Sequence, residues 1–324
     1  MFKQTLENFP KQFEWQPEID NAEKLTPKEK IIVLGMGGSH LAADLARTWA
    51  PYWGKILVHS DYGLPELKDE ELASYLIIAS SYSGNTEEVI DGLSAALEKN
   101  LTVVVAASGG QLLETAQKQI LPYIKLPAES IQPRVALGHS LLAILKLAGQ
   151  EETIKELREL VYMLKVEEIK PEAQKLAEKL RGQVPIIYAS TRKLPLAVNW
   201  KVKFNETAKI PAFANAVPEL NHNEMAGFDV STASRELGEK FSFIILEDKY
   251  DHLKNQKRLA ALAELFKVRG LAVERIQLQG QNHWHKIFSS VVMADWTSYY
   301  LAEFYGVEVE NVPTVEEFKK KLIG

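Results

Sequence analysis

The stretch Ile31-Ile-Val-Leu-Gly-Met-Gly-Gly-Ser-His40 decides the fold class. Four apolar residues lead into a glycine-rich turn, and the next segment places apolar residues at Leu41, Leu45 and Trp49, the spacing of one helix face. An apolar strand that passes through a tight turn into an amphipathic helix is typical of a parallel sheet covered on both faces. The glycines also let backbone N–H groups approach an anion at the N-terminus of that helix.

The same alternation continues along the whole chain. In the first half, apolar runs predict strands at 31–34, 56–58, 76–79, 101–106 and 123–126, with helical patterns between them. A charge-rich helical segment at 151–180, interrupted by Pro171, precedes a second series. That series predicts strands at 184–188, 241–246 and 273–278 and helices near 193–208, 252–268 and 283–304. We therefore predict an α/β fold of two tandem, doubly wound domains with mainly parallel sheets, over residues 1–150 and 151–324.

Composition excludes several classes of protein. The 324 residues suit two domains, and a hydrophobic content of 46% can fill their cores. The absence of cysteine excludes a disulfide scaffold, a thiol nucleophile and a thiolate metal site. A net charge of −5 argues against nucleic-acid binding. No signal peptide or membrane-spanning run is visible, so we expect a cytoplasmic protein without a membrane partner.

A cluster of hydroxyl groups follows the predicted third strand, in Ser80-Ser-Tyr-Ser-Gly-Asn-Thr-Glu-Glu88. Ser81, Ser83 and Thr86 surround a glycine at the start of a helix, where hydroxyls, backbone N–H groups and the helix dipole favour a phosphate monoester. A helix N-cap is the alternative, but one hydroxyl suffices for a cap. The sequence therefore predicts a phosphate site built from these hydroxyls and from the first turn, at Gly37, Gly38 and Ser39.

The glycine-rich turn has two other interpretations. It can be a tight turn without a ligand, or part of a dinucleotide fingerprint, in which Asp61 would bind the ribose. The fingerprint needs glycine at the position of His40, and it leaves the hydroxyl cluster unexplained. A nucleotide-dependent oxidoreductase is therefore a weaker hypothesis.

The two loops resemble those of the sugar isomerase (SIS) domain, which binds phosphosugars. Three further segments resemble motifs of bifunctional phosphoglucose/phosphomannose isomerases: QPRVALG at 132–138, PELNHNE at 218–224 and DWTSYYLA at 295–302. The resemblance implies an aldose–ketose isomerase without a cofactor or metal, which interconverts glucose 6-phosphate and mannose 6-phosphate with fructose 6-phosphate. A regulatory protein that binds sugar phosphates without catalysis stays open as the alternative.

The resemblance also implies four catalytic residues. Glu206 would be the base that moves the proton between C1 and C2, and Arg134 would stabilise the enediolate. His222 would open the sugar ring, with its tautomer fixed by the neighbouring Asn221 and Asn223. Lys319, the first of three consecutive lysines at 319–321, would complete the site.

A homodimer is the last implication of the resemblance, with His222 reaching into the site of the partner subunit. The aromatic stripe from Trp296 to Tyr305 is by itself more typical of an intramolecular core. Two positions depart from the family pattern, namely His40 beside the phosphate loop and the segment 306–310 before the last helix. His283 and His285 are two positions apart in a predicted helix and would point apart, so we predict no metal site.

Overall fold

The computed structural model describes residues 1–49, 52, 54–128, 131–229 and 231–323. It contains two compact units, Glu7–Leu164, here called the N-terminal unit, and Met1–Leu6 with Lys165–Gly324, here called the C-terminal unit. The helices α7 (Glu151–Arg158) and α8 (Leu160–Met163) pack against η1 (Phe9–Glu14) of the N-terminal unit. The compact units thus divide the chain after Leu164, and the domain boundary at residue 150 stays a prediction.

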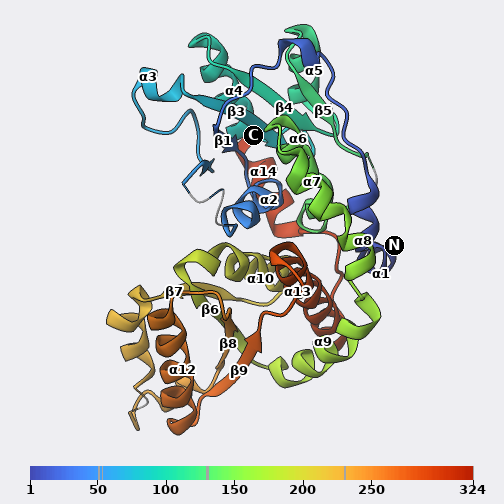
Figure 1. Ribbon diagram of the computed structural model, residues 1–324. Coiled ribbons are helices and arrows are strands. Elements are labelled where there is room, and N and C mark those ends of the chain that lie inside the picture. Colours follow the sequence, from blue (N-terminus) through green and yellow to red (C-terminus); the bar gives the residue numbers. More distant parts are fainter. Residues whose placement is uncertain (50–51, 53, 129–130, 230, 324) are drawn as a thin grey trace. The chain divides into compact units, whose positions relative to one another are not determined.

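The N-terminal unit is built on five parallel strands (Figure 1). They run in the order β2-β1-β3-β4-β5, with β1 at Lys30–Leu34, β2 at Ile56–His59, β3 at Tyr75–Ser81, β4 at Val103–Ala107 and β5 at Tyr123–Lys125. Every residue of β3 and β4 is buried, because helices cover both faces of the sheet. The chain leaves β1 toward one edge and β3 toward the other, which makes their carboxyl ends the topological switch point.

Helices follow these strands as the sequence predicts. The longer ones are α2 (Gly38–Arg47), α4 (Glu87–Glu98), α5 (Gly110–Lys118) and α6 (Leu137–Leu147); the shorter ones are α3 (Asp69–Leu72), η2 (Ala22–Lys24) and η4 (Pro133–Val135). The helix α6 packs against α2, while α4 and α5 pack on β3 and β4. The apolar core between α4, α5 and the sheet includes Ile77, Val89, Val105 and Leu112.

The C-terminal unit repeats this plan with four parallel strands. Their order is β7-β6-β8-β9, with β6 at Val184–Ser190, β7 at Phe213–Val217, β8 at Phe241–Glu247 and β9 at Ala272–Gln277. The strand β7 is absent from the sequence prediction, because FANAV is short and mixes Asn and Ala into a half-exposed run. The order makes β6 and β8 the counterparts of β1 and β3.

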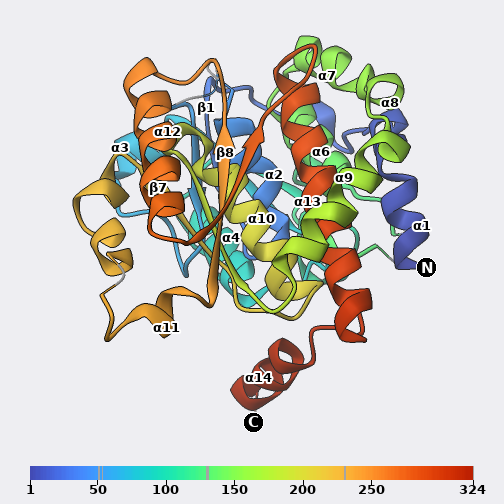
Figure 2. The ribbon, with the colours of Figure 1, turned by 90° about the horizontal axis from the view of Figure 1, so that it is seen from below.

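Helices cover both faces of this second sheet. Figure 2 shows α12 (Leu253–Val268) on one side of β8, and α10 (Leu194–Glu206) and α13 (His283–Tyr305) on the other. The remaining helices are α1 (Phe2–Glu7), α9 (Val166–Leu180), η5 (Thr191–Lys193), η6 (Glu219–His222), η7 (Glu224–Phe228), α11 (Arg235–Gly238) and α14 (Pro313–Ile323).

The predicted interruption at Pro171 is wrong, because α9 continues through this residue. Proline there removes one N–H group from the helix ladder. The helix compensates by packing along α13 and by burying an apolar face that includes Ala173, Leu176 and Leu180.

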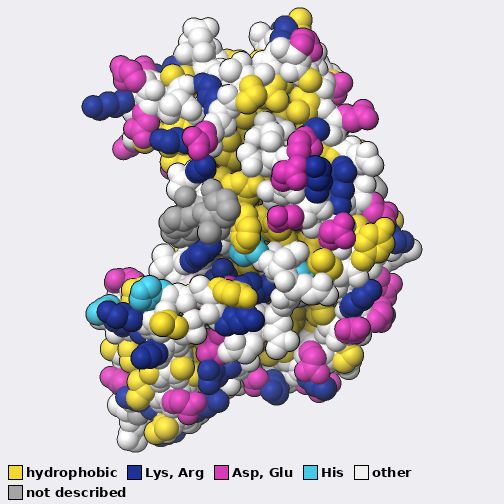
Figure 3. All heavy atoms as spheres, viewed as in Figure 1, with side chains coloured by type: hydrophobic (Ala, Val, Ile, Leu, Met, Phe, Trp, Pro, Cys, Tyr) yellow, Lys and Arg dark blue, Asp and Glu magenta, His cyan; other side chains and the backbone are white. Residues whose placement is uncertain are grey.

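The surface carries both signs of charge. On the face shown in Figure 3, acidic and basic side chains are intermixed, as the small net charge leads one to expect. No helix in the described ranges is both long and apolar enough to cross a membrane.

Candidate active site

The three predicted hydroxyls converge at the carboxyl end of β3. Ser81 Oγ lies 2.7 Å from Thr86 Oγ1 and 3.5 Å from Ser83 Oγ, and it accepts a hydrogen bond of 3.1 Å from the backbone N–H of Gly84. Thr86 is the N-cap of α4, so the cluster lies at the positive end of a helix dipole. This arrangement offers several neutral hydrogen-bond donors to one anionic group.

Gly84 fixes the shape of the hydroxyl loop. Its φ is +72°, and a Cβ at this position would lie 1.8 Å from the carbonyl oxygen of Gly109. Close by, the side-chain oxygen of Asn85 accepts a hydrogen bond of 3.0 Å from the backbone N–H of Gln111. The loop after β3 therefore rests directly on the turn after β4, and this close approach requires glycine at position 84.

Two other motifs pack against the glycine-rich turn that follows β1. Gly37, at φ +50°, is the N-cap of α2. A Cβ on Gly38 would lie 2.6 Å from the backbone nitrogen of Arg134, and Ser39 Oγ accepts a hydrogen bond of 3.0 Å from the N–H of Tyr82. The segments 35–40, 80–88 and 132–138, separate in the sequence, therefore meet at this switch point.

His40 does not point back over this turn. Its Nδ1 lies 2.6 Å from Asp44 Oδ2, one helical turn further along α2, and Asp44 also pairs with Arg47 at 3.1 Å. The side chain of His40 is thus directed along its own helix.

Arg134 brings a permanent positive charge to the same place. Its residue is 1% exposed, and Nη1 donates to Gln132 Oε1 at 3.5 Å. Gln12, far away in the sequence, donates from Nε2 to the carbonyl of Val135 at 2.8 Å and accepts from the N–H of Gly138 at 2.9 Å. This clamp holds the Arg134 segment, and sequence reasoning missed Gln12 because a lone amide carries no local signal.

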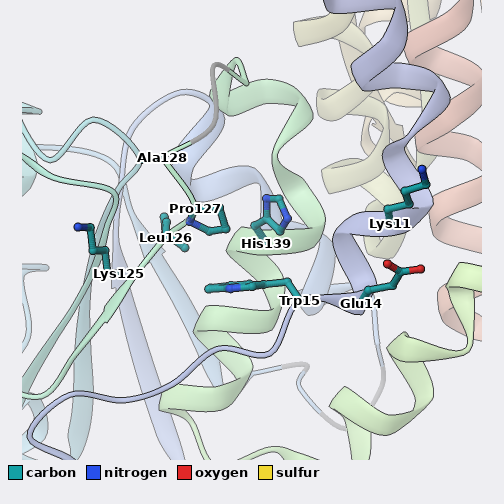
Figure 4. A pocket seen from close by; sticks show the side chains of 8 residues that line it. All are labelled: Lys11, Glu14, Trp15, Lys125, Leu126, Pro127, Ala128 and His139. Carbon is teal, nitrogen blue, oxygen red and sulfur yellow. The ribbon is translucent and has the colours of Figure 1, made fainter.

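A cavity of about 550 Å³ opens at the carboxyl end of β5 (Figure 4). Its walls include Trp15 and His139, whose rings meet edge to face with centroids 5.4 Å apart. Burial lowers the pKa of His139 to about 4, so this imidazole is neutral at pH 7. The carbonyl of Pro127, also in the wall, accepts a hydrogen bond of 2.8 Å from the hydroxyl of Tyr82 in the hydroxyl loop.

Glu206 lies in the C-terminal unit, as the half-buried last residue of α10. Its carbonyl accepts a hydrogen bond from Lys209 Nζ. One turn earlier, the buried Lys203 pairs with Asp295 of α13 at 2.7 Å. The end of α10 that carries Glu206 is thus anchored to α13.

His222 is the exposed last residue of η6, and its imidazole makes no hydrogen bond to any residue that the structure describes. Asn221 Oδ1 accepts from Arg258 at 3.3 Å, and Asn223 Nδ2 donates to Glu219 at 2.9 Å. The two flanking amides are therefore engaged elsewhere, and the prediction that they fix the tautomer of His222 is wrong for this chain.

Lys319 lies on the exposed helix α14, where its Nζ pairs with Glu316 at 3.1 Å. The neighbouring Lys320 and Lys321 are exposed as well. The choice among the three lysines and the role of Lys319 stay predictions.

Known proteins resemble both the second half of this chain and its whole length. Residues 169–322 match the family model of the bacterial phospho-glucose isomerase C-terminal SIS domain. A bifunctional phosphoglucose/phosphomannose isomerase from Caldicellulosiruptor bescii is 32% identical, over 98% of this chain and 98% of its own. The chain belongs to the family of bifunctional phosphoglucose/phosphomannose isomerases. A member from Aquifex aeolicus is 31% identical, over 98% of this chain and 97% of its own.

Solved structures support the fold of this phosphoglucose/phosphomannose isomerase family member. The C-terminal domain of glucosamine-fructose-6-phosphate aminotransferase from Francisella tularensis superposes with a TM-score of 0.70 at 12% identity, over 96% of this chain and 98% of that one. The predicted α/β fold with parallel sheets of SIS type is confirmed.

His283 and His285 both lie in the first turn of α13, as predicted. In the described ranges, no group of three or more His, Asp or Glu side chains is arranged to hold a metal ion.

Proposed function

We propose that this family member interconverts glucose 6-phosphate and mannose 6-phosphate with fructose 6-phosphate. The observation that carries the proposal is the meeting of the hydroxyl loop, the glycine-rich turn and Arg134 at one switch point. Such a crevice suits a phosphorylated hexose, because the donors can bind the phosphate while the buried guanidinium faces the sugar. The names of the two relatives agree with this substrate class.

The phosphate is bound by Ser81, Ser83 and Thr86, with the turn Gly37-Gly38-Ser39 closing the other side. These hydroxyls, the backbone N–H groups of the two loops and two helix N-termini form what we call the phosphate cage. They stabilise the dianion by hydrogen bonds and helix dipoles, without a lysine or arginine side chain among them. The rest of the sugar then extends toward Arg134.

The isomerisation moves one proton between neighbouring carbons. His222 passes a proton between O1 and O5 and opens the ring. The Glu206 carboxylate takes the proton from C2 of the aldose, and the C–H electron pair forms the enediolate, whose charge Arg134 stabilises. The hydroxyl proton of O2 passes to O1 while Glu206 returns its proton to C1, so O1 becomes a hydroxyl and C2 becomes the carbonyl carbon. Lys319 is the candidate for a further contact to the substrate.

The protein acts as a homodimer in which each site uses His222 of the partner subunit, and we place it in the cytoplasm. The exposure of His222 and its lack of a hydrogen-bond partner within the described chain support a role outside its own subunit. The substitution pairs below test this arrangement.

The deciding experiment is a coupled assay of fructose 6-phosphate formation from each aldose, with Glu206→Gln as the variant. We expect kcat to fall by at least ~100-fold, because the amide cannot accept the C2 proton. KM should change only a few-fold, since the loss affects the chemical step. The matched control is Glu236→Gln, an exposed residue of α11, which should retain full activity.

Solvent deuterium separates an enzyme from a sensor. The wild type should place deuterium at C2 of the aldose product, and Glu206→Gln should do so at the same reduced rate as turnover. If the wild type binds the sugar phosphates but shows neither turnover nor exchange, the protein is a sugar-phosphate sensor.

The shared site is tested by mixing subunits. Inactive Glu206→Gln and His222→Ala chains, mixed in equal amounts and allowed to exchange, should regain about a quarter of wild-type activity, since half of the dimers then contain one intact site. No recovery in subunits shown to exchange would place His222 in its own chain's site.

A further inference from the structure

Glu224 ends the PELNHNE segment, and the mechanism above does not use it. We infer that Glu224 is a positioning residue, which anchors the loop of His222 to the second sheet and so sets where the imidazole stands. This inference rests on the proposed role of His222, and its test separates the two.

The Glu224 carboxylate bridges two neighbouring strands. The hydroxyl of Tyr188, in β6, donates to Oε1 at 2.6 Å, and Asn215, in β7, donates from Nδ2 to Oε2. Tyr188 is fully buried, and burial together with the Glu224 charge raises the pKa of its hydroxyl, which therefore stays a donor. Hydrogen bonds to a charged acceptor are among the stronger ones in proteins.

The backbone of Glu224 is also hydrogen-bonded within the loop that carries His222. The side-chain oxygen of Asn223 accepts from the N–H of Glu224, and the amide nitrogen of Asn223 donates to Glu219 at 2.9 Å. The Asn223 side chain thus ties Glu219, before His222, to the backbone of Glu224, after it. At the other end, Thr191 Oγ1 donates to the carbonyl of Val217 at 3.0 Å and holds the start of the segment.

His222 has no such fixation of its own. It is exposed, and its ring has no hydrogen-bond partner within the described chain. The position of the imidazole is therefore determined by the residues around it. Leu220 is packed in the core, and the Glu224 carboxylate accepts hydrogen bonds from the second sheet. Loss of the carboxylate would free the side of the loop that follows the histidine.

A carboxylate is needed at this position because both of its partners donate. Glutamine has the same shape but presents an NH₂ group to either Tyr188 or Asn215. The Asn215 amide cannot turn over without cost, since its oxygen already accepts a hydrogen bond of 2.8 Å from Ala216 N–H. With the NH₂ group toward Asn215, two donors face each other; with it toward Tyr188, the hydroxyl oxygen accepts but the buried O–H loses the acceptor it has in Glu224. Glu224→Gln therefore weakens the anchor in either orientation.

The first test compares Glu224→Gln with Tyr188→Phe and with the exposed control Glu236→Gln. We expect kcat to fall about tenfold in Glu224→Gln, because displacement of a catalytic group by ~1 Å can cost up to about 100-fold. KM for fructose 6-phosphate should stay within about twofold, since the phosphate cage is untouched. Tyr188→Phe keeps the ring packed against Phe243 and should lose less, and Glu236→Gln should match the wild type.

The decisive measurement repeats the substitution in a His222→Ala background. If Glu224 acts through His222, Glu224→Gln should cause no further loss there, within about twofold. In mixed dimers Glu224→Gln should restore activity with Glu206→Gln but not with His222→Ala. Turnover at the wild-type level in Glu224→Gln, or an equal loss in both backgrounds, would overturn the inference alone. A fully active His222→Ala enzyme would instead overturn the proposed role of His222, and the inference with it.

Should Glu224→Gln not fold, Tyr188→Phe carries the same test. Circular dichroism and urea unfolding establish which variants are native. A native Tyr188→Phe enzyme with unchanged kcat would then refute the anchor.

Discussion

The carboxyl ends of β1 and β3 and those of β6 and β8 are equivalent places in two sheets, because the strand order β2-β1-β3-β4 corresponds to β7-β6-β8-β9. The first of these crevices is lined by glycines and the hydroxyls of Ser81, Ser83 and Thr86. The second is filled by charged side chains. Lys193 and Lys286 both pair with Asp248, with Nζ–Oδ2 distances of 3.1 and 2.7 Å, and the three side chains are at most 6% exposed.

The difference between a lining of hydroxyls and a filling of ion pairs indicates a different role for each crevice. A buried charge without a partner is costly, so each charge held in the second crevice is paired with one of opposite sign. In the first crevice the hydroxyl loop offers neutral donors to a dianion, and the positive charge beside it is that of Arg134. Topology thus provides the place twice, and we propose that the N-terminal unit turns it into the sugar-phosphate site.

The largest effect is expected from breaking the network of the second crevice. Asp248→Ala leaves the ammonium groups of Lys193 and Lys286 buried without their partner. We expect the free energy of unfolding to fall by about 3–5 kcal/mol. Urea unfolding at pH 7.5 measures it, and Asp69→Ala, which breaks the exposed pair with Lys99, should cost at most about 1 kcal/mol. Equal small losses in both variants would show that the buried network is not a unit.

Acid should weaken the same crevice. Burial, with help from Lys193 and Lys286, lowers the pKa of His283 to about 3, below its ordinary value of 6.5. The unfolded chain therefore binds a proton that the folded one does not, and stability falls as the pH drops from 6.5 toward 3. His283 should account for about 2 kcal/mol of lost stability between pH 7.5 and pH 5.

The measurement is the slope of the free energy of unfolding against pH, compared between the wild type and His283→Asn. The variant should show a flatter slope between pH 7 and 5, whatever its absolute stability. His139, with a pKa of about 4 through burial alone, should keep its own share of the slope. An unchanged slope would mean that the pKa of His283 is the same in the folded and the unfolded chain.

A substitution in the first crevice should change the affinity for the sugar phosphate more than the free energy of unfolding. Ser83→Ala removes one hydroxyl of the cage, and we expect fructose 6-phosphate to bind about tenfold more weakly, or ~1.5 kcal/mol, the scale of a hydrogen bond to a charged group. Calorimetry measures the affinity, and Ser94→Ala on the exposed face of α4 is the control. Unaltered affinity in Ser83→Ala would remove this hydroxyl from the site.

The sequence predicted what local pattern controls. The apolar runs 31–34 and 101–106 became the buried parallel strands β1 and β4, and the hydroxyls at the end of β3 gather as expected. It failed where distant packing decides, at the half-exposed strand β7 and at Pro171.

Long-range hydrogen bonds also lie beyond sequence patterns. Gln12 reaches Val135 and Gly138, and Glu224 reaches Tyr188, across segments that no periodicity connects. The number of charged residues likewise does not show whether a crevice is filled by ion pairs. Nothing in the sequence around Lys193 or Asp248 marks these two residues as partners.

The smallest effect should come from replacing the whole network at once. In Lys193→Met, Asp248→Leu and Lys286→Met combined, no ammonium is left without its carboxylate, and the new side chains have similar volumes. Apolar replacement of buried ion pairs is often neutral, and the nearby Asp251, whose pKa burial already raises, can take up a proton once Lys193 is gone. The free energy of unfolding should therefore stay within about 1 kcal/mol of the wild type. Affinity for fructose 6-phosphate should not change, because the cage lies at the other switch point. A loss as large as that of Asp248→Ala would show that the charges themselves are needed there, and a loss of sugar-phosphate affinity would make the second crevice a binding site as well.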